Sequence, residues 1–316
     1  TKALSQTQTD FDHNNVFVSY AYYLGHGKTW AANNSEAQMY IDGSTISYNG
    51  NLWKNETTSY YWPKDGGSLT FFAYSYNKKD MTVGDNSGFA CVWALGEDGQ
   101  YQGGITGHFD VATNKNVDFL VADIAADKTE NENSYAHTGV PTLFRHKLSM
   151  VNVAANLAED YANKKFILNS VKFTNLCHYA TYSQIPEKMI PGGNMFLSDQ
   201  VYAENVGFEV KSGGLIAVPA EIKKGAGVED GQYIYIPQEF NDDSYIVITY
   251  TVETVVGNKV VKEECTKPVK VKDVFPKWEM GHRYTFNLTF SLNEIHWDPA
   301  VENWIDDEAG NITIDR

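Results

Sequence analysis

Runs of β-branched and aromatic residues recur at short intervals along the chain, separated by segments rich in Gly, Asn and Asp. Such runs are typical of β-strands, because branched and aromatic side chains pack well on a pleated, half-buried surface. They predict strands over residues 16–23, 69–76, 117–122, 166–173, 245–252 and 284–292. In the last run, polar residues alternate with Tyr284, Phe286, Leu288, Phe290 and Leu292. We therefore expect one face of this strand to be buried in the core and the other to be exposed to solvent.

Two aromatic runs, 60–63 and 69–76, flank a turn-forming stretch that ends in Gly66 and Gly67. This arrangement predicts strand, turn, strand. Leaving large apolar side chains such as Trp62 in water would forfeit roughly 1.5–3 kcal/mol each. We therefore expect Trp62 and Pro63 in a β-sandwich core, with a ligand-binding platform as the alternative.

Other segments show turn and loop signals rather than strand signals. Asp42-Gly43, Asn49-Gly50 and Gly257-Asn258 are dipeptides favoured in two-residue hairpin turns. Residues 84–107 are rich in glycine and predict a loop-rich insertion, and 186–214 predicts loops and short edge pieces. Asp298 followed by Pro299 predicts one short helical turn.

The length of the chain favours two domains. A single core rarely grows beyond about 250–300 residues, and this chain has 316. The most polar connecting segment is 123–138, so we predict an N-terminal domain over 1–138 and a C-terminal domain over 139–316. The fold class expected is all-β, two tandem β-sandwich domains with a few short helical turns.

Charge and hydropathy exclude two classes of partner. A formal net charge of −15 argues against nucleic acid, because phosphate binding needs clustered Lys and Arg. No run of about 18 apolar residues is long enough to span a membrane. The sequence begins at Thr1 without Met, which suggests a trimmed mature form whose export signal or lipid-anchor cysteine has been removed.

The sequence offers no enzyme, metal or cofactor signal. Cys91, Cys177 and Cys265 are too far apart for a compact metal motif, and we interpret them as small buried residues or unpaired thiols, with one disulfide as the alternative. His146 lies between apolar residues and is expected to be structural. Adjacent carboxylates at 242–243 and 306–307 are interpreted as solvated turns, because neighbours on a strand point to opposite faces.

Several motifs occur in the order found in one family. They are Tyr-Trp-Pro and Leu-Thr-Phe-Phe-Ala-Tyr-Ser at 61–75, Val-Asp-Phe-Leu-Val-Ala at 117–122, Phe-x-His-x-Leu-Ser-x-Val at 144–151, Ile-Pro-Gln at 236–238, and a closing block of Trp278, Gly281, Tyr284, Ile-x-Trp and Val-x-x-Trp up to Trp304. Over residues 16–304 the chain thus resembles the fimbrillin-like proteins of Bacteroides and relatives, the type V pilins.

The resemblance implies a subunit of cell-surface fimbriae. It implies transthyretin-like topology in both domains, export as an outer-membrane lipoprotein, removal of the first strand by proteolysis, and assembly with other pilin subunits by strand addition. The candidate donor strand at the C-terminus comprises Asn311, Ile312, Thr313, Ile314 and Asp315. Arginine occurs only at 145, 283 and 316, so the family's arginine-specific cleavage has no site near the N-terminus, and a tip or anchor subunit is as credible as a stalk subunit.

The alternative is a surface glycan-binding lipoprotein that does not polymerise. Aromatic rings exposed in irregular segments could stack on sugars, and the candidates are Trp93, Tyr101, Tyr179 and Tyr182. Solvent exposure of two or more coplanar rings would favour this hypothesis over core packing.

Overall fold

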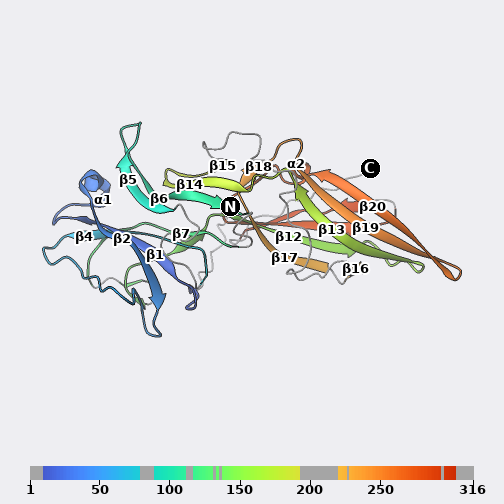
Figure 1. Ribbon diagram of the computed structural model, residues 1–316, viewed down its shortest axis with the longest axis horizontal. Helices are drawn as coiled ribbons and strands as arrows, with labels where there is room; N and C mark the ends of the chain where they lie inside the picture. Colours follow the sequence, from blue (N-terminus) through green and yellow to red (C-terminus); the bar gives the residue numbers. More distant parts are fainter. Residues whose placement is uncertain are drawn as a thin grey trace, which may run out of the picture.

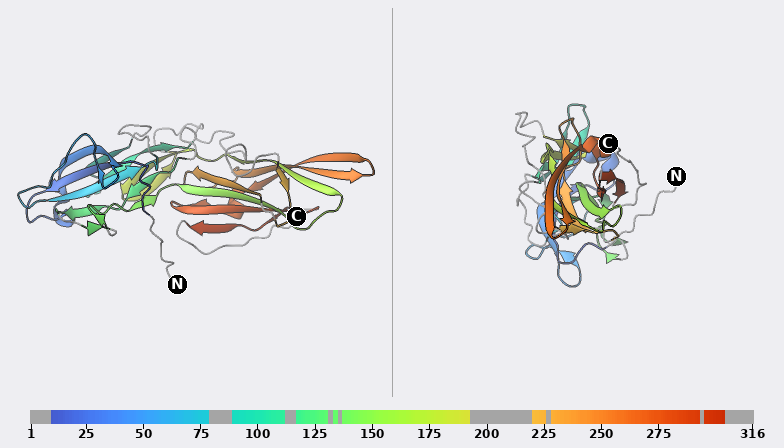
Figure 2. Two further views of the ribbon diagram at one scale, coloured as in Figure 1. Left: turned by 90° about the horizontal axis from the view of Figure 1, so that it is seen from below. Right: turned by 90° about the vertical axis from the view of Figure 1, so that its right-hand side faces the viewer.

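The computed structural model describes residues 10–78, 89–111, 117–130, 133–134, 137–192, 220–225, 228–292 and 295–303. Within these residues the fold is all-β, with mostly antiparallel sheets and three short helical turns. The helical turns are α1 (Trp30–Asn33), η1 (Asn34–Glu36) and α2 (Val271–Val274). The expected all-β class with a few short helical turns is therefore confirmed. The molecule is elongated, with two groups of sheets following one another along its long axis (Figures 1 and 2).

Two sheets form the first group. The N-terminal sheet has the order β11-β7-β4-β1-β2-β3, with β8 also paired to β4. Its strands are β1 (Phe17–Leu24), β2 (Gln38–Tyr48), β3 (Trp53–Lys54), β4 (Ser68–Ser75), β7 (Leu120–Ala122), β8 (Ala125–Lys128) and β11 (Phe144–His146). The hairpin sheet has the order β15-β14-β6-β5, from β5 (Ala90–Leu95), β6 (Tyr101–Asp110), β14 (Tyr179–Ile185) and β15 (Glu187–Pro191).

Two further sheets form the second group. The mixed sheet has the order β17-β12-β22-β23, with β24 paired to β22; its strands are β12 (Ser149–Leu157), β17 (Val228–Tyr235), β22 (His282–Phe290), β23 (Ile295–Trp297) and β24 (Ala300–Asn303). The C-terminal antiparallel sheet is β16-β13-β19-β20, from β13 (Lys164–Thr174), β16 (Ala220–Ile222), β19 (Tyr245–Val256) and β20 (Lys259–Lys270). Two small pairs complete the set: β9 (Asn133–Ser134) with β10 (His137–Thr138), and β18 (Gln238–Glu239) with β21 (Lys277–Trp278).

Aromatic side chains fill the space between facing sheets. In the first group, Tyr76 on the N-terminal side lies 5.8 Å from Phe109 of β6, measured between ring centroids. In the second group, Phe173 of β13 lies 5.1 Å from Phe286 of β22. Strand β22 shows why these sheets form: its alternate residues from Tyr284 to Phe290 are buried, as the sequence pattern predicts. Most buried apolar side chains of both groups belong to one connected cluster, and Phe17, Ala73 and Ala122 form a small second one.

Most of the predicted strands are confirmed, but the first aromatic run is not a strand. Residues 60–63 form no regular element, and β4 follows alone. Tyr61 is exposed, and its carbonyl accepts a 2.6 Å hydrogen bond from the Tyr40 hydroxyl, while Trp62 packs against Phe71. The run therefore lies over the outside of the N-terminal sheet.

Two turn expectations were wrong because glycine serves a different purpose there. Strand β2 continues through Asp42-Gly43, where Gly43 has φ of 69° and the β1–β2 register shifts, so the dipeptide forms a bulge. The glycine-rich segment after residue 89 is the β5–β6 hairpin rather than a loop. A Cβ on Gly103 would lie 2.1 Å from the Val92 carbonyl oxygen, so glycine permits close strand contact.

Of two other predicted turns, one is confirmed and one is wrong. Gly257-Asn258 forms the expected turn between β19 and β20. No helical turn begins at Asp298; β24 begins at Ala300 instead and pairs with β22, because pairing with a buried central strand overrides a local capping signal.

Two strand pairings cross residue 138. Strand β11 pairs with β7, and β14 pairs with β6. The β14–β15 hairpin, which comes after β13 in the sequence, thus belongs by hydrogen bonding to the first group of sheets. The chain thus enters the second group with β12 and β13, returns to the first group with β14 and β15, and enters the second group again with β16.

Candidate interaction surfaces

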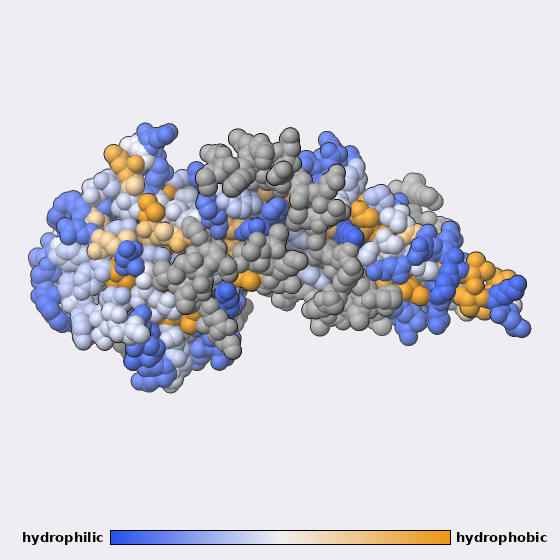
Figure 3. Space-filling view, viewed as in Figure 1, coloured by the Kyte–Doolittle hydropathy of each residue, from blue (hydrophilic) through white to orange (hydrophobic). Residues whose placement is uncertain are grey.

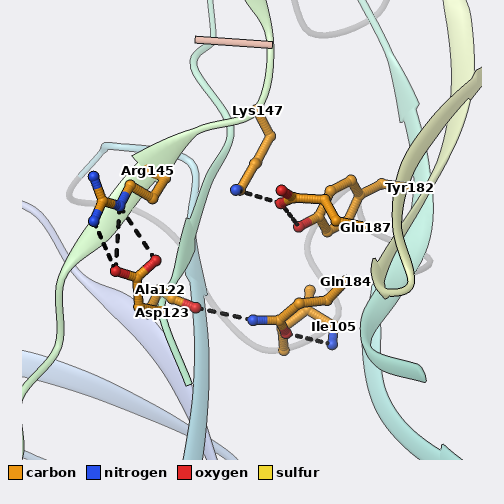
Figure 4. A network of polar contacts seen from close by, with 8 residues as sticks. All are labelled: Ile105, Ala122, Asp123, Arg145, Lys147, Tyr182, Gln184 and Glu187. Atoms are coloured by element: carbon orange, nitrogen blue, oxygen red, sulfur yellow. Dashed lines mark hydrogen bonds and ion pairs between the residues drawn. The ribbon is translucent and has the colours of Figure 1, made fainter. Parts of the chain in front are cut away.

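The junction between the two groups of sheets holds a polar network built around Lys147 (Figure 4). Lys147 lies between β11 and β12, and only 10% of its side chain is exposed. Its ammonium donates to Glu187 Oε1 at 2.5 Å, and the Tyr182 hydroxyl donates to the same oxygen at 2.9 Å. The Glu187 carboxylate therefore satisfies two donors from different parts of the fold.

Burial also sets the protonation state of Tyr182. Loss of hydration raises the pKa of this phenol, and the neighbouring Glu187 charge raises it further. The phenol is therefore neutral at physiological pH and can donate its proton to the carboxylate.

Gln184 of β14 joins the two sheets of the first group. Its Nε2 donates to the carbonyl of Ala122 at 2.9 Å, and its Oε1 accepts from the amide of Ile105 at 3.0 Å. Ile105 is fully buried, so its amide depends on a protein acceptor. One side chain thus hydrogen-bonds to backbone groups of both β7 and β6.

Arg145 of β11 adds a bidentate contact to Asp123, with Nη2 to Oδ2 at 2.9 Å and Nε to both carboxylate oxygens at 3.2 Å. Both side chains are partly exposed, so the pair contributes little to stability and mainly fixes the end of β11. Nearby, His146 Nδ1 lies 2.6 Å from Asp118 Oδ2. The interpretation of His146 as a structural histidine agrees with this partner.

Trp93 and Tyr101, two of the residues predicted to stack on glycans, come together on the β5–β6 hairpin. Their ring centroids are 6.3 Å apart and their planes differ by 30°. Trp93 is half-buried, its Nε1 donates to the Asn34 carbonyl at 3.0 Å, and its ring lies 4.7 Å from that of Trp30. The two rings thus lie in strands, not in the irregular segment that the sequence suggested.

Tyr179 and Tyr182 lie on opposite faces of β14. Tyr182 is fully buried, with its ring 5.5 Å from that of Phe119, so it presents no face to a sugar and is not a glycan-stacking residue. Tyr179 is half-buried and stacks on His108 with centroids 5.6 Å apart. Alternation along 179–185 was the signal that could have separated the two.

An exposed tyrosine cluster was not predicted. Tyr61 is 73% exposed, Tyr60 and Tyr40 are 43% and 41% exposed, and the rings of Tyr23 and Tyr40 lie 6.5 Å apart. The polar residues that precede Tyr60 were the available signal that this run leaves the core.

The other features considered in the sequence are the donor strand, the cysteines, metal ligands and membrane spans. The candidate donor strand, Asn311 to Asp315, lies outside the described residues. All three cysteines are free thiols, and burial raises the pKa of Cys91 to about 12. In the part of the chain that the structure describes, no group of His, Cys, Asp and Glu side chains could hold a metal ion. None of the helices among those residues has the length and apolar character needed to cross a membrane.

One family model matches nearly the whole chain. The model of the fimbrillin-like family matches residues 1–304. A fimbrial protein from Bacteroides vulgatus is similar in structure, with a TM-score of 0.68 and 18% identity over 91% of this chain and 92% of that one. The tip fimbrial protein Mfa3 from Porphyromonas gingivalis has a TM-score of 0.38 and 10% identity over 93% and 95% of the two chains. The comparison with curated proteins gave no match.

Proposed function

Because the chain belongs to the fimbrillin-like family, we propose that it is a structural and adhesive subunit of cell-surface fimbriae, or pili. The observation that carries this proposal is the family match over nearly the whole chain. The elongated all-β fold supports it, since a fimbrial protein from Bacteroides has a similar fold. The family and these relatives are fimbrial proteins, not enzymes, in line with a role in cell adhesion.

Assembly is proposed to proceed by strand addition between subunits. An open sheet edge offers unpaired N–H and C=O groups, and a strand from the next subunit can pair with them while alternate side chains fill pockets. The donor strand proposed from the sequence is 311–315, where Ile312 and Ile314 share one face. The precursor is proposed to be an exported lipoprotein of the outer membrane, and the subunit can serve as stalk, tip or anchor.

The proposed domains are 1–138 and 139–316, each a β-sandwich of transthyretin-like topology. Facing sheets in each group support the sandwich architecture. The strand pairings across residue 138 imply that the C-terminal domain contributes β11 and β14 to the sheets of the N-terminal domain.

Electron microscopy and SDS-resistant laddering of the native protein, produced from its full precursor in its own cells, test the proposal. Filaments and ladders are the expected result. A monomer that forms no filaments, even after proteolytic trimming of the N-terminus, would exclude the stalk role and would favour a capping tip adhesin or the glycan-binding alternative.

Variants of the C-terminus then test the donor strand. Deleting residues 306–316, or replacing both Ile312 and Ile314 by Asp, is expected to abolish laddering, because the charges would enter apolar pockets. The matched control is Thr313→Asp, on the opposite face of the same segment. Normal polymer from the deletion variant would exclude 311–315 as the donor strand.

A glycan-binding role without polymerisation is the second candidate. The specific observation in its favour is the near-parallel pair of Trp93 and Tyr101 on one hairpin. A glycan array with the native protein and with Tyr101→Ala tests it, and Tyr48→Ala removes a tyrosine ring from a different strand as the control. Equal binding by both variants would exclude this pair as a sugar platform.

A further inference from the structure

The β19–β20 hairpin extends beyond the sheet that supports it. Strands β19 and β20 pair from Tyr245 and Lys270 out to Val256 and Lys259, whereas β13 accompanies β19 only as far as Thr254. We call residues 255–261 the valine tip. It forms one extreme of the long axis of the molecule (Figures 1 and 3).

Apolar surface is exposed on both faces of the valine tip. Directly opposed residues share a face, so Val255 and Val260 lie on one face, and Val256 and Val261 lie on the other. The four side chains are 47%, 55%, 61% and 55% exposed in that order. On the face that Figure 3 shows, an orange patch lies close to the end of this otherwise largely hydrophilic hairpin.

The rest of β20 carries the features that keep an edge strand from associating. Glu263, Glu264 and Lys267 are exposed or partly exposed charges, and Pro268 cannot donate to another strand. The valine tip carries one charge, Lys259, and no proline, although it is the most accessible part of the strand. Exposed β-branched residues at such a position indicate a surface that is covered in the assembled protein.

Charge indicates what covers it. The valine tip contains Lys259 and no acidic residue, whereas the whole chain has a formal net charge of −15. A second copy of the chain would therefore attract the tip electrostatically while its apolar contacts exclude water. The position at the end of the long axis brings the tip against the next copy when elongated subunits join end to end.

We propose that the valine tip docks on an adjacent copy of this chain in the fimbria, as an assembly contact separate from strand addition. This proposal rests on the proposed function. The tip contact orients successive subunits, and the added strand joins them.

Site-specific photo-crosslinking in the producing cells tests the contact. A photoreactive amino acid at Asn258, in the turn of the valine tip, is expected to give a crosslinked product of two copies that mass spectrometry identifies. A crosslink only to another protein, or no crosslink in cells that do form filaments, would overturn the proposal. Absence of filaments from the unmodified protein would instead exclude the stalk role and this inference with it.

Substitutions then separate docking from folding. Val256→Thr with Val261→Thr keeps the branched shape that strands favour but removes apolar surface, and Val256→Asp with Val261→Asp adds repulsion. We expect the crosslink yield to fall by about tenfold for the Asp pair and less for the Thr pair, with filaments shortened in the same order.

The matched control is Val92→Asp with Leu95→Asp on the β5 edge strand. These residues are 46% and 62% exposed and lie on another hairpin, so the same chemistry is changed away from the tip. Unchanged thermal unfolding of the purified variants shows that each folds. Normal filament length and crosslink yield in the Asp pair at the tip would exclude docking.

Discussion

Lys147 and Glu187 form an ion pair whose two members are unequally buried. The side chain of Lys147 is 10% exposed and that of Glu187 is 46% exposed. Removing either partner leaves the other without its counter-charge, and the cost depends on whether water can reach the charge that remains.

We therefore predict that Glu187→Ala destabilises the protein more than Lys147→Met does. Without Glu187, a nearly buried ammonium and the Tyr182 hydroxyl both lose their acceptor, at a cost of about 2–3 kcal/mol. Without Lys147, the carboxylate turns to water, and the loss is about 1 kcal/mol or less. Denaturant unfolding measures both, with Lys277→Met at an exposed pair as the control. The reverse order would refute the argument.

Buried phenols make the protein sensitive to alkali. Burial raises the pKa of Tyr20, Tyr22 and Tyr182 above the ordinary value of 10.0. Above pH 10 these groups ionise in the unfolded chain before they ionise in the folded one, so the unfolded state is favoured as the pH rises. Their contribution to stability is complete below pH 10 and is lost as the pH rises toward the folded pKa values.

The expected result is a fall in unfolding free energy above pH 10 of about 1.4 kcal/mol per pH unit for each such phenol. Tyr182→Phe should reduce this slope by one phenol, although its stability near pH 7 is lower because the hydrogen bond to Glu187 is lost. Urea unfolding at several pH values measures the slope. A slope equal to that of the native protein would contradict the assignment.

At the scale of elements, β14 is the strand on which the first group of sheets depends. It pairs with β6, and Gln184 connects it to β7. Its neighbour β15 follows directly in the sequence, but β6 and β7 come from residues far away, so the place of the β14–β15 hairpin is fixed by the fold rather than by its local turn.

Gln184→Leu is predicted to loosen this connection. The change leaves the Ala122 carbonyl and the buried Ile105 amide without their partner, which costs about 1–3 kcal/mol for a buried group. Hydrogen exchange at Ile105 should speed up before global unfolding does. Ser183→Ala, one residue away and only partly buried, is the control and should leave that exchange unchanged.

Local sequence patterns predicted where most strands lie, but they did not predict which strands pair with one another. The alternation from Tyr284 to Phe290 and the continuous apolar run of β1 each identify a strand and its buried residues. Gly43 and Gly103 misled the turn assignments, since glycine serves equally in a turn, a bulge and a close strand contact. Nothing local in 179–191 indicates a return to the first group of sheets.

The interaction surfaces were predicted only in part, for the same reason. Trp93 and Tyr101 were among the four candidate rings and lie 6.3 Å apart, but nothing in the sequence paired them. The burial of Tyr182 depends on Phe119, more than 60 residues earlier. The valine tip was visible as a turn, whereas its lack of cover depends on where β13 ends. The family motifs identified the class of protein because they are spread over most of the chain and do not depend on predicting individual contacts.

At the scale of the whole molecule, the two groups of sheets are not separable at residue 138. A fragment of 139–316 retains β11 and the β14–β15 hairpin but lacks β7 and β6. It would expose Tyr182 and neighbouring apolar residues that are buried in the intact protein.

We predict that fragment 139–316 aggregates or binds a hydrophobic dye when produced alone, and that co-production with fragment 1–138 gives a soluble complex. Size-exclusion chromatography and dye fluorescence measure both outcomes. A dispersed 139–316 fragment that unfolds cooperatively by itself would show that the returning hairpin is dispensable.

The parallel pairing of β12 with β22 joins residues 149–157 to 282–290. The chain is synthesised from its N-terminus, so more than a hundred residues are made between β12 and its parallel neighbour β22. The first group of sheets likewise cannot be completed before β14 and β15 have been made. Long-range pairings of this kind fold slowly, because the chain must close large loops before the contacts form. The order of synthesis thus keeps the edge of β12 open until almost the last strand has emerged, whereas every strand of the first group is present once β15 has been made.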